Sequence, residues 1–237
     1  MPHPSTTPLE IARKQLLSAA TGWTPQQEIC GVSNALGRVL ATEQISSVDL
    51  PQTDNVAVDG YAVEAAFLAA HPDHLFKVAG TARAGHPFGG TAAPGEAVRV
   101  FTGAVMPEGP DCVIMHEDCQ ISEAGVICGK QLKSGINMRP AGENIAAGET
   151  LAAEGVFLGA ADIGQLAAAG LSQIPVFQPL KIALMSTGDE LVQAGDTRKV
   201  GQIFDSNRPM VAALCHQRGA PLTDYGIIRD DQIRLTS

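Results

Sequence analysis

Residues 180–191 read LKIALMSTGDEL, an apolar run that ends in hydroxyl, glycine and acidic residues. A buried strand of a parallel sheet is typically apolar on both faces, and its carboxyl end delivers a polar loop. Residues 208–218, RPMVAALCHQR, have a proline near the start, and Gly219 lies just past the end, as is typical of a helix. Residues 220–231, APLTDYGIIRDD, predict the next strand. We therefore expect a βαβ unit with a right-handed crossover.

Upstream of this unit, short β-type runs dominate. Between about residues 75 and 129, the runs FKVAGTARAG, EAVRVFTGA, DCVIMHED and GVICGK are separated by glycine and proline clusters. This spacing predicts a compact β-rich domain. The flanking segments differ, because residues 9–20 and 160–171 predict helices and residues 35–45 predict a short helix that turns into a strand.

The composition restricts the classes of function. The chain has 237 residues, of which 45% are hydrophobic, and 16 basic against 25 acidic side chains give a net charge of −9. It can therefore bury a core, but it lacks the basic, aromatic-rich surface that binds a bare nucleic-acid backbone. The first fifteen residues contain no apolar signal-peptide core, and charges and glycines interrupt residues 151–171. We expect a cytoplasmic protein that contacts neither nucleic acid nor a membrane.

The five cysteines do not fit a known disulfide framework, since their number is odd and no CxxC pair occurs. Cys112, His116, Cys119 and Cys128 have a spacing that could suit a metal. They fall, however, in a predicted strand–turn–strand region, where alternate side chains face opposite ways. We expect buried free cysteines that act as small hydrophobic residues.

Two polar segments lie in or near the β-rich region. Residues 54–61, DNVAVDGY, place two carboxylates and an amide in a turn, which could hold a hydrated cation or only cap Asx turns. Residues 99–104, RVFTGA, end a strand with a hydroxyl and accessible backbone N–H groups. That pattern suits a phosphate or a pterin edge, but it also suits a plain hairpin loop.

Two further polar segments belong to the βαβ unit. Residues 186–190, STGDE, lie at the carboxyl end of a strand, where ligands of open α/β sheets bind. Asp189 and Glu190 could orient Mg²⁺ or water, or one of them could cap a helix. Residues 204–209, FDSNRP, stand at a helix start, whose free N–H groups attract anions. Asp205 would repel a phosphate there unless Mg²⁺ bridges the two or the carboxylate accepts a hydrogen bond from a sugar or pterin.

Together, these segments resemble the molybdenum insertases, the molybdopterin molybdenumtransferase family that includes the E domain of gephyrin. The resemblance covers nearly the whole chain in the family's order. It is carried by DNVAVDGYAV, VRVFTGAVMPEGPDCVIMHED, NMRPAGENI, ALMSTGDELV and GQIFDSNRPM. Val56 and Val58 depart from the pattern, because the family usually has Ser and Met at these positions.

The resemblance implies a multidomain fold of β and α/β parts. Residues 1–50 and 138–178 would form a discontinuous, elongated α+β domain that serves as linker and dimerisation domain. Residues 51–137 would form an inserted β-rich domain. Residues 179–237 would form an incomplete, three-layer α/β molybdopterin-binding domain. Since the family's α/β domain continues further, we expect either a chain truncated within it or a second polypeptide that completes the sheet.

The resemblance also implies an activity, the last step of molybdenum cofactor synthesis. Family members are cytosolic homodimers that use Mg²⁺ and insert molybdenum from molybdate into adenylyl-molybdopterin, with release of AMP. Molybdopterin adenylyltransferase is a possible partner. Two alternatives stay open: an inactive remnant that acts only as a dimerising or binding scaffold, and a bare pterin or nucleotide binder.

The family's functional residues carry over by motif. Asp59 and Thr102 would line the active cleft from the β-rich domain, across the dimer, and with Glu190 they form the implied catalytic set. Asp189, Glu190 and Asp205 are the implied Mg²⁺ ligands. The implied substrate-binding residues are Ser186, Thr187, Gly188, Asp189, Asp205, Ser206 and Asn207.

Overall fold

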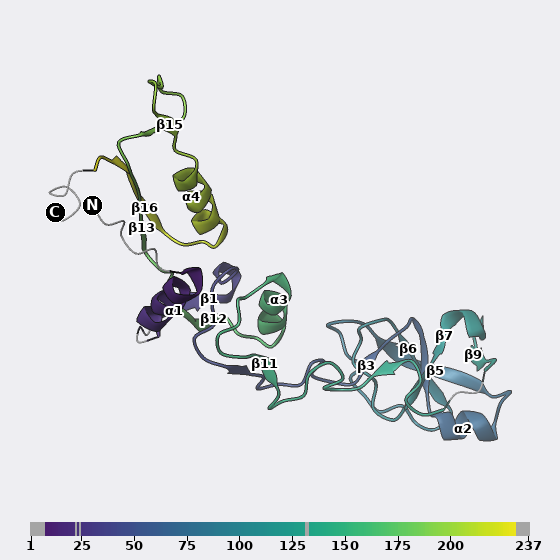
Figure 1. Ribbon diagram of the computed structural model, residues 1–237. Helices are drawn as coiled ribbons and strands as arrows, with labels where there is room; N and C mark the ends of the chain where they lie inside the picture. The colour runs from purple at the N-terminus through teal and green to yellow at the C-terminus, as the bar shows by residue number, and fades with distance from the viewer. Residues whose placement is uncertain (1–7, 22, 24, 131–132, 231–237) are drawn as a thin grey trace. The chain divides into compact units, whose positions relative to one another are not determined.

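The computed structural model describes residues 8–21, 23, 25–130 and 133–230 (Figure 1). The chain divides into two units, and each is described by itself. The first contains the described residues of Met1–Glu43, Ala153–Gly164 and Leu171–Ser237; the second contains Gln44–Ala152 and Gln165–Gly170. The mixture of a β-rich part and an α/β part agrees with the sequence, whereas the division into three domains stays a prediction.

The amino-terminal part of the first unit combines a helix with a strand pair. Helix α1 (Leu9–Ala20) matches its prediction. Strand β1 (Gln27–Gly31) pairs antiparallel with β12 (Gln173–Phe177), and the short 3-10 helix η1 (Val32–Asn34) follows β1. Segments more than 140 residues apart in sequence thus lie side by side.

The prediction of a helix beginning at residue 35 was wrong. Gly37 adopts the left-handed conformation at φ +75°, which ends any helical path. Val39 and Leu40 instead form isolated bridges with Phe157 and Val176. Only the strand at the end of this segment, β2 (Gln44–Ile45), was predicted correctly.

The predicted βαβ unit is present in the first unit. Strand β13 (Ile182–Thr187) pairs in parallel with β16 (Leu222–Ile228), and α4 (Asn207–Gln217) connects them and packs on both. A small parallel pair, β14 (Leu191–Val192) and β15 (Ile203–Phe204), precedes α4. The sequence after Asp230, DQIRLTS, predicts the start of another helix, but these residues lie outside the described part of the chain.

Strand β13 differs from its prediction in burial. Its residues alternate between half-buried and exposed, whereas the apolar sequence predicted burial on both faces. In the described part of the chain its one hydrogen-bonded neighbour is β16, and α4 packs against the pair. A strand covered on one face shows this alternation.

The second unit is built around a six-stranded sheet with the order β7-β4-β6-β5-β9-β8. Strands β5 and β6 are parallel, and the other neighbours are antiparallel. This sheet confirms the β-rich region. Its strands are β4 (Gly60–Val63), β5 (Leu75–Ala82), β6 (Glu96–Val100), β7 (Cys112–Met115), β8 (Cys119–Ser122) and β9 (Gly125–Cys128).

Both faces of this sheet are covered by apolar side chains. Tyr61 and Val63 of β4 belong to one buried cluster and Ala62 to another, as strand alternation requires. Helix α2 (Ala65–Ala70) places Leu68 in the first cluster. Burial of Cys112 and Cys128, expected from the sequence, is confirmed, whereas Cys119 is only half-buried.

Two short antiparallel strand pairs lie outside the six-stranded sheet. Strand β3 (Asn55–Val56) pairs with β10 (Met138–Arg139), and β2 pairs with β11 (Thr150–Ala152). The short 3-10 helix η2 (His116–Asp118) follows β7.

Helix α3 (Ala160–Ala168) matches its prediction and spans the division between the units. Among the described residues, no helix has the length and apolar character needed to span a membrane.

Candidate functional site

The sequence-predicted site residues fall into two groups. Asp59 and Thr102 lie in the second unit. The others lie in the first unit, at the end of β13, on the loop after it and around the start of α4. These are Ser186, Thr187, Gly188, Asp189, Glu190, Asp205, Ser206 and Asn207.

The group in the first unit lies at the carboxyl edge of the parallel pair β13 and β16. Thr187, the last residue of β13, lies opposite Ile228, the last residue of β16. Beyond these ends, Arg229 Nη1 donates a hydrogen bond to the carbonyl oxygen of Asp189 at 2.6 Å. Helix α4 begins at Asn207. Open α/β sheets bind ligands at this edge.

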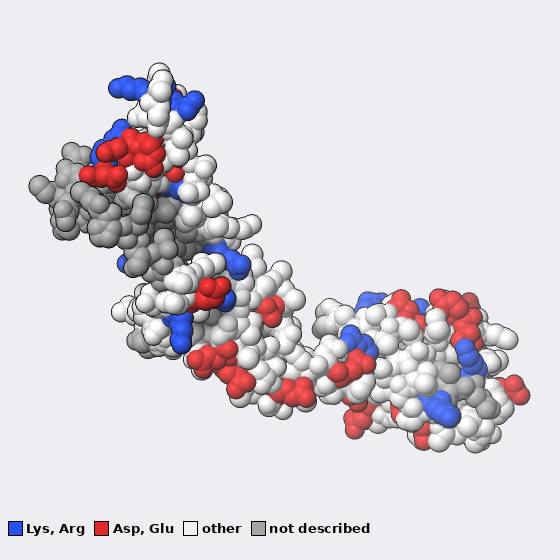
Figure 2. Space-filling model, in the orientation of Figure 1, with Lys and Arg blue, Asp and Glu red and all other residues white. Residues whose placement is uncertain are grey.

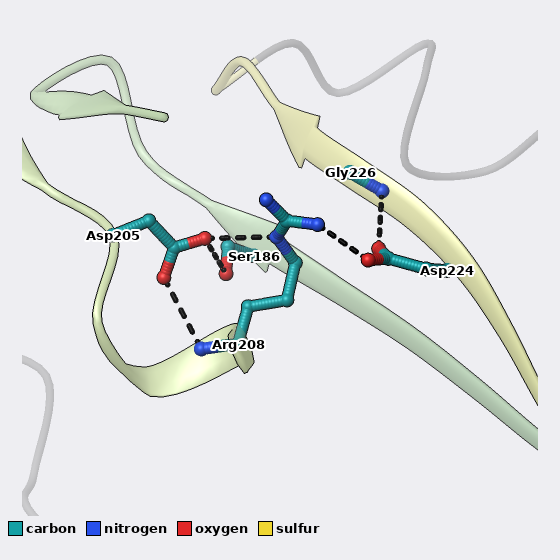
Figure 3. Close-up of polar contacts among 5 residues, drawn as sticks. All are labelled: Ser186, Asp205, Arg208, Asp224 and Gly226. Carbon is teal, nitrogen blue, oxygen red and sulfur yellow. Dashed lines mark hydrogen bonds and ion pairs between the residues drawn. The ribbon is translucent and has the colours of Figure 1, made fainter. Parts of the chain in front are cut away.

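Asp205 is the best-anchored carboxylate of this group (Figure 3). Its Oδ2 accepts hydrogen bonds from Ser186 Oγ at 2.8 Å and from Arg208 Nε at 2.9 Å, while Oδ1 accepts the Arg208 main-chain N–H at 3.2 Å. Burial by itself raises the pKa of Asp205, but these hydrogen bonds and the guanidinium charge outweigh it and lower the pKa. The group is therefore ionised at neutral pH.

The sequence reasoning missed Arg208. Its Nη1 donates to Oδ2 of Asp224, whose Oδ1 accepts the Gly226 N–H at 2.8 Å (Figure 3). The hydrogen bond with Asp205 contributes most to a raised pKa of Arg208. Arg208 therefore connects the start of α4 to β16. The sequence did contain one indication of this contact: Arg208 follows Asp205 by three residues, a spacing that brings side chains together on a helix.

The N-terminus of α4 is capped by the side chain of Asp205 and not by that of the N-cap residue. Ser206 occupies the N-cap position but makes no side-chain cap hydrogen bond. Asp205 supplies that bond instead, through Oδ1 and the Arg208 N–H. Ser206 and Asn207 are exposed at the helix start, where N–H groups and the helix dipole favour an anion.

The loop after β13 needs its glycine. Gly188 has φ +146°, and a Cβ atom there would come within 2.5 Å of the Glu190 carboxylate. The Glu190 side chain therefore folds back over Gly188, while Asp189 is exposed beside it. Gly188 N donates to the carbonyl oxygen of Ile228 at 3.2 Å, which ties the loop to β16.

The predicted magnesium ligands do not form an all-protein cage. Within the described residues, no three His, Cys, Asp or Glu side chains gather as a metal site. Magnesium usually keeps several waters and takes one or two carboxylates together with substrate phosphates. The exposed pair Asp189 and Glu190 fits that mode, whereas Asp205 already accepts three hydrogen bonds.

The structure brings Asp59 and Thr102 together. Residues Gly60 and Val100 are paired in the β4–β6 ladder, so the residue before β4 meets the loop after β6. Asp59 Oδ1 accepts both the Thr102 N–H and the Thr102 hydroxyl, each at 2.8 Å. The backbone bond contributes most, followed by the hydroxyl bond, to a lowered pKa of Asp59.

Charged and aromatic neighbours surround this pair. Arg99 Nη1 contacts His116 Nδ1, and because arginine can only donate, Nδ1 accepts and the ring proton is on Nε2. The Arg99 guanidinium lies 4.8 Å from the centre of the Tyr61 ring. Arg99 and His116 were missed as site neighbours, since only strand pairing brings them beside Asp59.

Charged side chains of both signs are spread over the face drawn in Figure 2. Acidic and basic side chains of the described residues are interspersed there, and no extended basic surface is visible on that face.

Comparison with known families matches almost the entire chain. Residues 7–170 match the model of the MoeA N-terminal region, which covers its domains I and II. Residues 183–237 match the model of a probable molybdopterin binding domain. The second match coincides with the βαβ unit that carries Asp205.

Curated relatives and a solved structure are similar to the chain. Molybdopterin molybdenumtransferase of Haemophilus influenzae is 35% identical over 225 residues, 94% of this chain and 55% of the relative. The protein of the same name from Nostoc sp. is 39% identical over 212 residues, 88% and 48% respectively. A crystal structure of the molybdopterin biosynthesis MoeA protein from Pyrococcus horikoshii has a TM-score of 0.78 at 30% identity, over 94% of this chain and 58% of that one. The chain thus spans about half the length of the curated relatives.

Proposed function

Because the chain belongs to the family of the MoeA N-terminal region, we propose that it functions in molybdenum cofactor biosynthesis as a molybdopterin molybdenumtransferase. The proposed reaction inserts molybdenum from molybdate into adenylyl-molybdopterin and releases AMP. One observation carries the proposal: polar and acidic groups gather at the carboxyl edge of β13 and β16, beside the start of α4, within the segment that matches a molybdopterin binding domain.

The α/β residues have separate roles in this proposal. The exposed start of α4, with Ser206 and Asn207, would receive an anionic group of the substrate through main-chain N–H groups. Ser186 and Arg208 hold Asp205 in place. Asp205 therefore acts as a positioning residue that fixes the first turn of α4 against β13.

Asp189 and Glu190 are the proposed magnesium ligands. Both carboxylates are exposed on the loop after β13, where waters and substrate phosphates can complete the coordination. When bound there, magnesium would neutralise phosphate charge that the acidic chain otherwise repels. We therefore favour these two residues over Asp205, whose oxygens accept hydrogen bonds from Ser186 and Arg208.

Asp59 and Thr102 are proposed to act from the second unit. The two hydrogen bonds from Thr102 hold the Asp59 carboxylate ionised and in one orientation, as an acceptor for a substrate N–H or O–H group. We propose that they complete the active site across a cytoplasmic homodimer. In that setting, a molybdopterin adenylyltransferase would supply the adenylylated substrate.

The test is AMP release by the purified chain with adenylyl-molybdopterin, molybdate and Mg²⁺. Activity that is lost in Glu190→Gln and Asp59→Asn, and retained in the matched control Glu154→Gln at an exposed position, would support the proposal. Titration calorimetry with and without Mg²⁺ measures substrate binding separately. A folded chain that neither binds the substrate nor releases AMP would favour the non-catalytic scaffold instead.

A further inference from the structure

The second unit carries a cationic patch, defined here as Arg83, Arg99, Phe101 and His116. Strands β5 and β6 run parallel with Ala82 opposite Val100, so Arg83 and Phe101 leave neighbouring strands at the same edge of the sheet. The loops that follow also approach each other, because a Cβ atom built on Gly103 would lie 3.6 Å from the Ala84 side chain. Parallel strands place their following loops together in this way.

Aromatic rings support both guanidinium groups of the patch. The Cζ of Arg83 lies 5.5 Å, and that of Arg99 5.2 Å, from the centre of the Phe101 ring. Arg99 also lies over Tyr61. Stacking restrains a guanidinium without using any of its N–H donors, which stay free for a planar or tetrahedral anion.

These donors lack carboxylate partners within the described residues. Neither Arg83 nor Arg99 takes part in an ion pair there. Arg99 uses one N–H on His116 Nδ1, which leaves the His116 Nε2–H as a further donor. Thr102 binds the Asp59 carboxylate and contributes most to its lowered pKa, and the nearby Arg99 guanidinium adds to that effect without an ion pair to Asp59.

The arrangement is unusual for a chain with a net charge of −9. Acidic side chains outnumber basic ones, yet two arginines converge on one ring without an acidic partner. Guanidinium groups bind tetrahedral oxyanions through parallel N–H bonds, and an overall acidic protein needs such local cations to bind an anion.

We propose that Arg83 and Arg99 form an oxyanion subsite that binds a phosphate group or a free tetrahedral oxyanion. Arg83 supplies exposed donors, Arg99 supplies restrained ones, and His116 Nε2–H adds a neutral donor. The identity of the anion in the cell rests on the proposed function, since adenylyl-molybdopterin carries phosphates and molybdate is itself tetrahedral. Binding to the patch does not depend on that function.

The test uses the full chain and two-dimensional NMR of the arginine Nε–Hε groups. Sodium phosphate, AMP and sodium molybdate are titrated separately, with sodium chloride at matched ionic strength. We expect the Arg83 and Arg99 signals to shift with the oxyanions. In Arg83→Gln the dissociation constant should rise about tenfold, as expected for loss of a charge-assisted hydrogen-bond donor.

Lys77→Gln is the matched control, because Lys77 is an exposed cation on β5, the strand that Arg83 follows, and lies outside the patch. The Lys77→Gln variant should bind the oxyanions with the same affinity as the unchanged chain. Tighter binding of molybdate than of phosphate or AMP assigns the subsite to a free oxyanion. Tighter binding of phosphate or AMP assigns it to a phosphate group. Either result supports the subsite. Equal shifts with chloride, or equal affinities of the two variants, would overturn it. Anion binding without AMP release would keep the subsite and contradict only the proposed function.

Discussion

Asp205 and Arg208 are joined twice, once through side chains and once through the main chain. The Arg208 Nε–H bonds to Oδ2 at 2.9 Å, and the Arg208 main-chain N–H bonds to Oδ1 at 3.2 Å (Figure 3). Their side chains are only 3% and 13% exposed. A single carboxylate thus caps α4 and balances a nearly buried cation, and removing its charge leaves that cation inadequately paired.

Asp205→Asn should therefore destabilise the first unit by about 3 kcal/mol, since it leaves the nearly buried guanidinium with only the more exposed Asp224 as a charged partner. The free energy of unfolding is measured in urea by tryptophan fluorescence. The single tryptophan, Trp23, belongs to the first unit and reports its unfolding.

Asp224→Asn is the matched control for this prediction. Asp224 bonds the same guanidinium, but its side chain is 40% exposed. Pairs open to solvent contribute about 1 kcal/mol or less. Equal losses in the two variants would show that burial does not distinguish the two carboxylates.

Thr102→Val should raise the pKa of Asp59 without restoring its ordinary value. The variant loses the hydroxyl bond, but the larger cause of the lowered pKa, the main-chain N–H of residue 102, remains. A lowered pKa in the folded state stabilises the protein above the unfolded value, and this contribution disappears as the pH falls through the folded value. Because its Asp59 pKa is higher, Thr102→Val should lose this stabilising contribution at a higher pH than the unchanged chain.

Carbon-13 NMR of the Asp59 carboxyl group measures this pKa directly. Thr91→Val is the control, because the Thr91 hydroxyl bonds to a different carboxylate, that of Glu108, at 3.0 Å. An unchanged Asp59 pKa in Thr102→Val would mean that the hydroxyl bond does not form in solution.

Gly60→Ala tests the close packing that fixes the position of Asp59. A Cβ atom at residue 60 would lie 1.9 Å from the carbonyl oxygen of Ile114, so β4 and β7 must separate. We expect a loss of about 3 kcal/mol in the second unit, at the upper end of overpacking costs because the obstacle is backbone. Thermal unfolding followed by circular dichroism measures it.

Gly89→Ala provides the comparison for Gly60. Nothing lies within 4 Å of a Cβ atom built at Gly89, and its backbone is outside the left-handed region. That variant should unfold within about 0.5 kcal/mol of the unchanged chain, as typical surface substitutions do. If Gly60→Ala were as stable as this control, the close approach of the two strands would be refuted.

Neighbouring residues were sufficient to predict those helices and strands whose formation depends mainly on their own sequence. The proline and glycine that flank residues 208–218 predicted α4 to within one residue of its observed bounds. The segment at residues 35–45 failed because its apolar spacing resembles a helix, while Gly37 and the bridge from Leu40 to Val176 decide its path. That bridge joins residues remote in sequence.

For the candidate site, too, the sequence identified residues but not the contacts between distant segments. The motifs identified Asp59 and Thr102, yet their contact depends on the pairing of β4 with β6. The sequence could not identify Arg99 as a neighbour of Asp59, because its contacts are with Tyr61 on β4 and His116 in η2. Periodicity predicts which residues lie on a face, but pairing register decides which side chains meet.

Cysteine reactivity gives a last prediction, because Cys112 and Cys119 differ in burial and ionisation. Burial raises the pKa of the Cys112 thiol to about 12. A hydrogen bond with Cys128, its partner across the β8–β9 ladder, lowers the pKa of the half-buried Cys119. Since thiolates are the reactive form, iodoacetamide at pH 8 should modify Cys119 first and leave Cys112 unmodified in the folded chain.

Mass spectrometry of tryptic peptides from a time course measures both rates. Cys128→Ala removes the hydrogen bond that favours the Cys119 thiolate, so Cys119 should react more slowly in that variant although its burial falls. Urea should expose Cys112 and bring its rate to that of an ordinary thiol. If Cys112 and Cys119 reacted equally fast in the folded chain, the second unit would open faster than alkylation occurs, and the packed cluster around Cys112 would not be stable in solution.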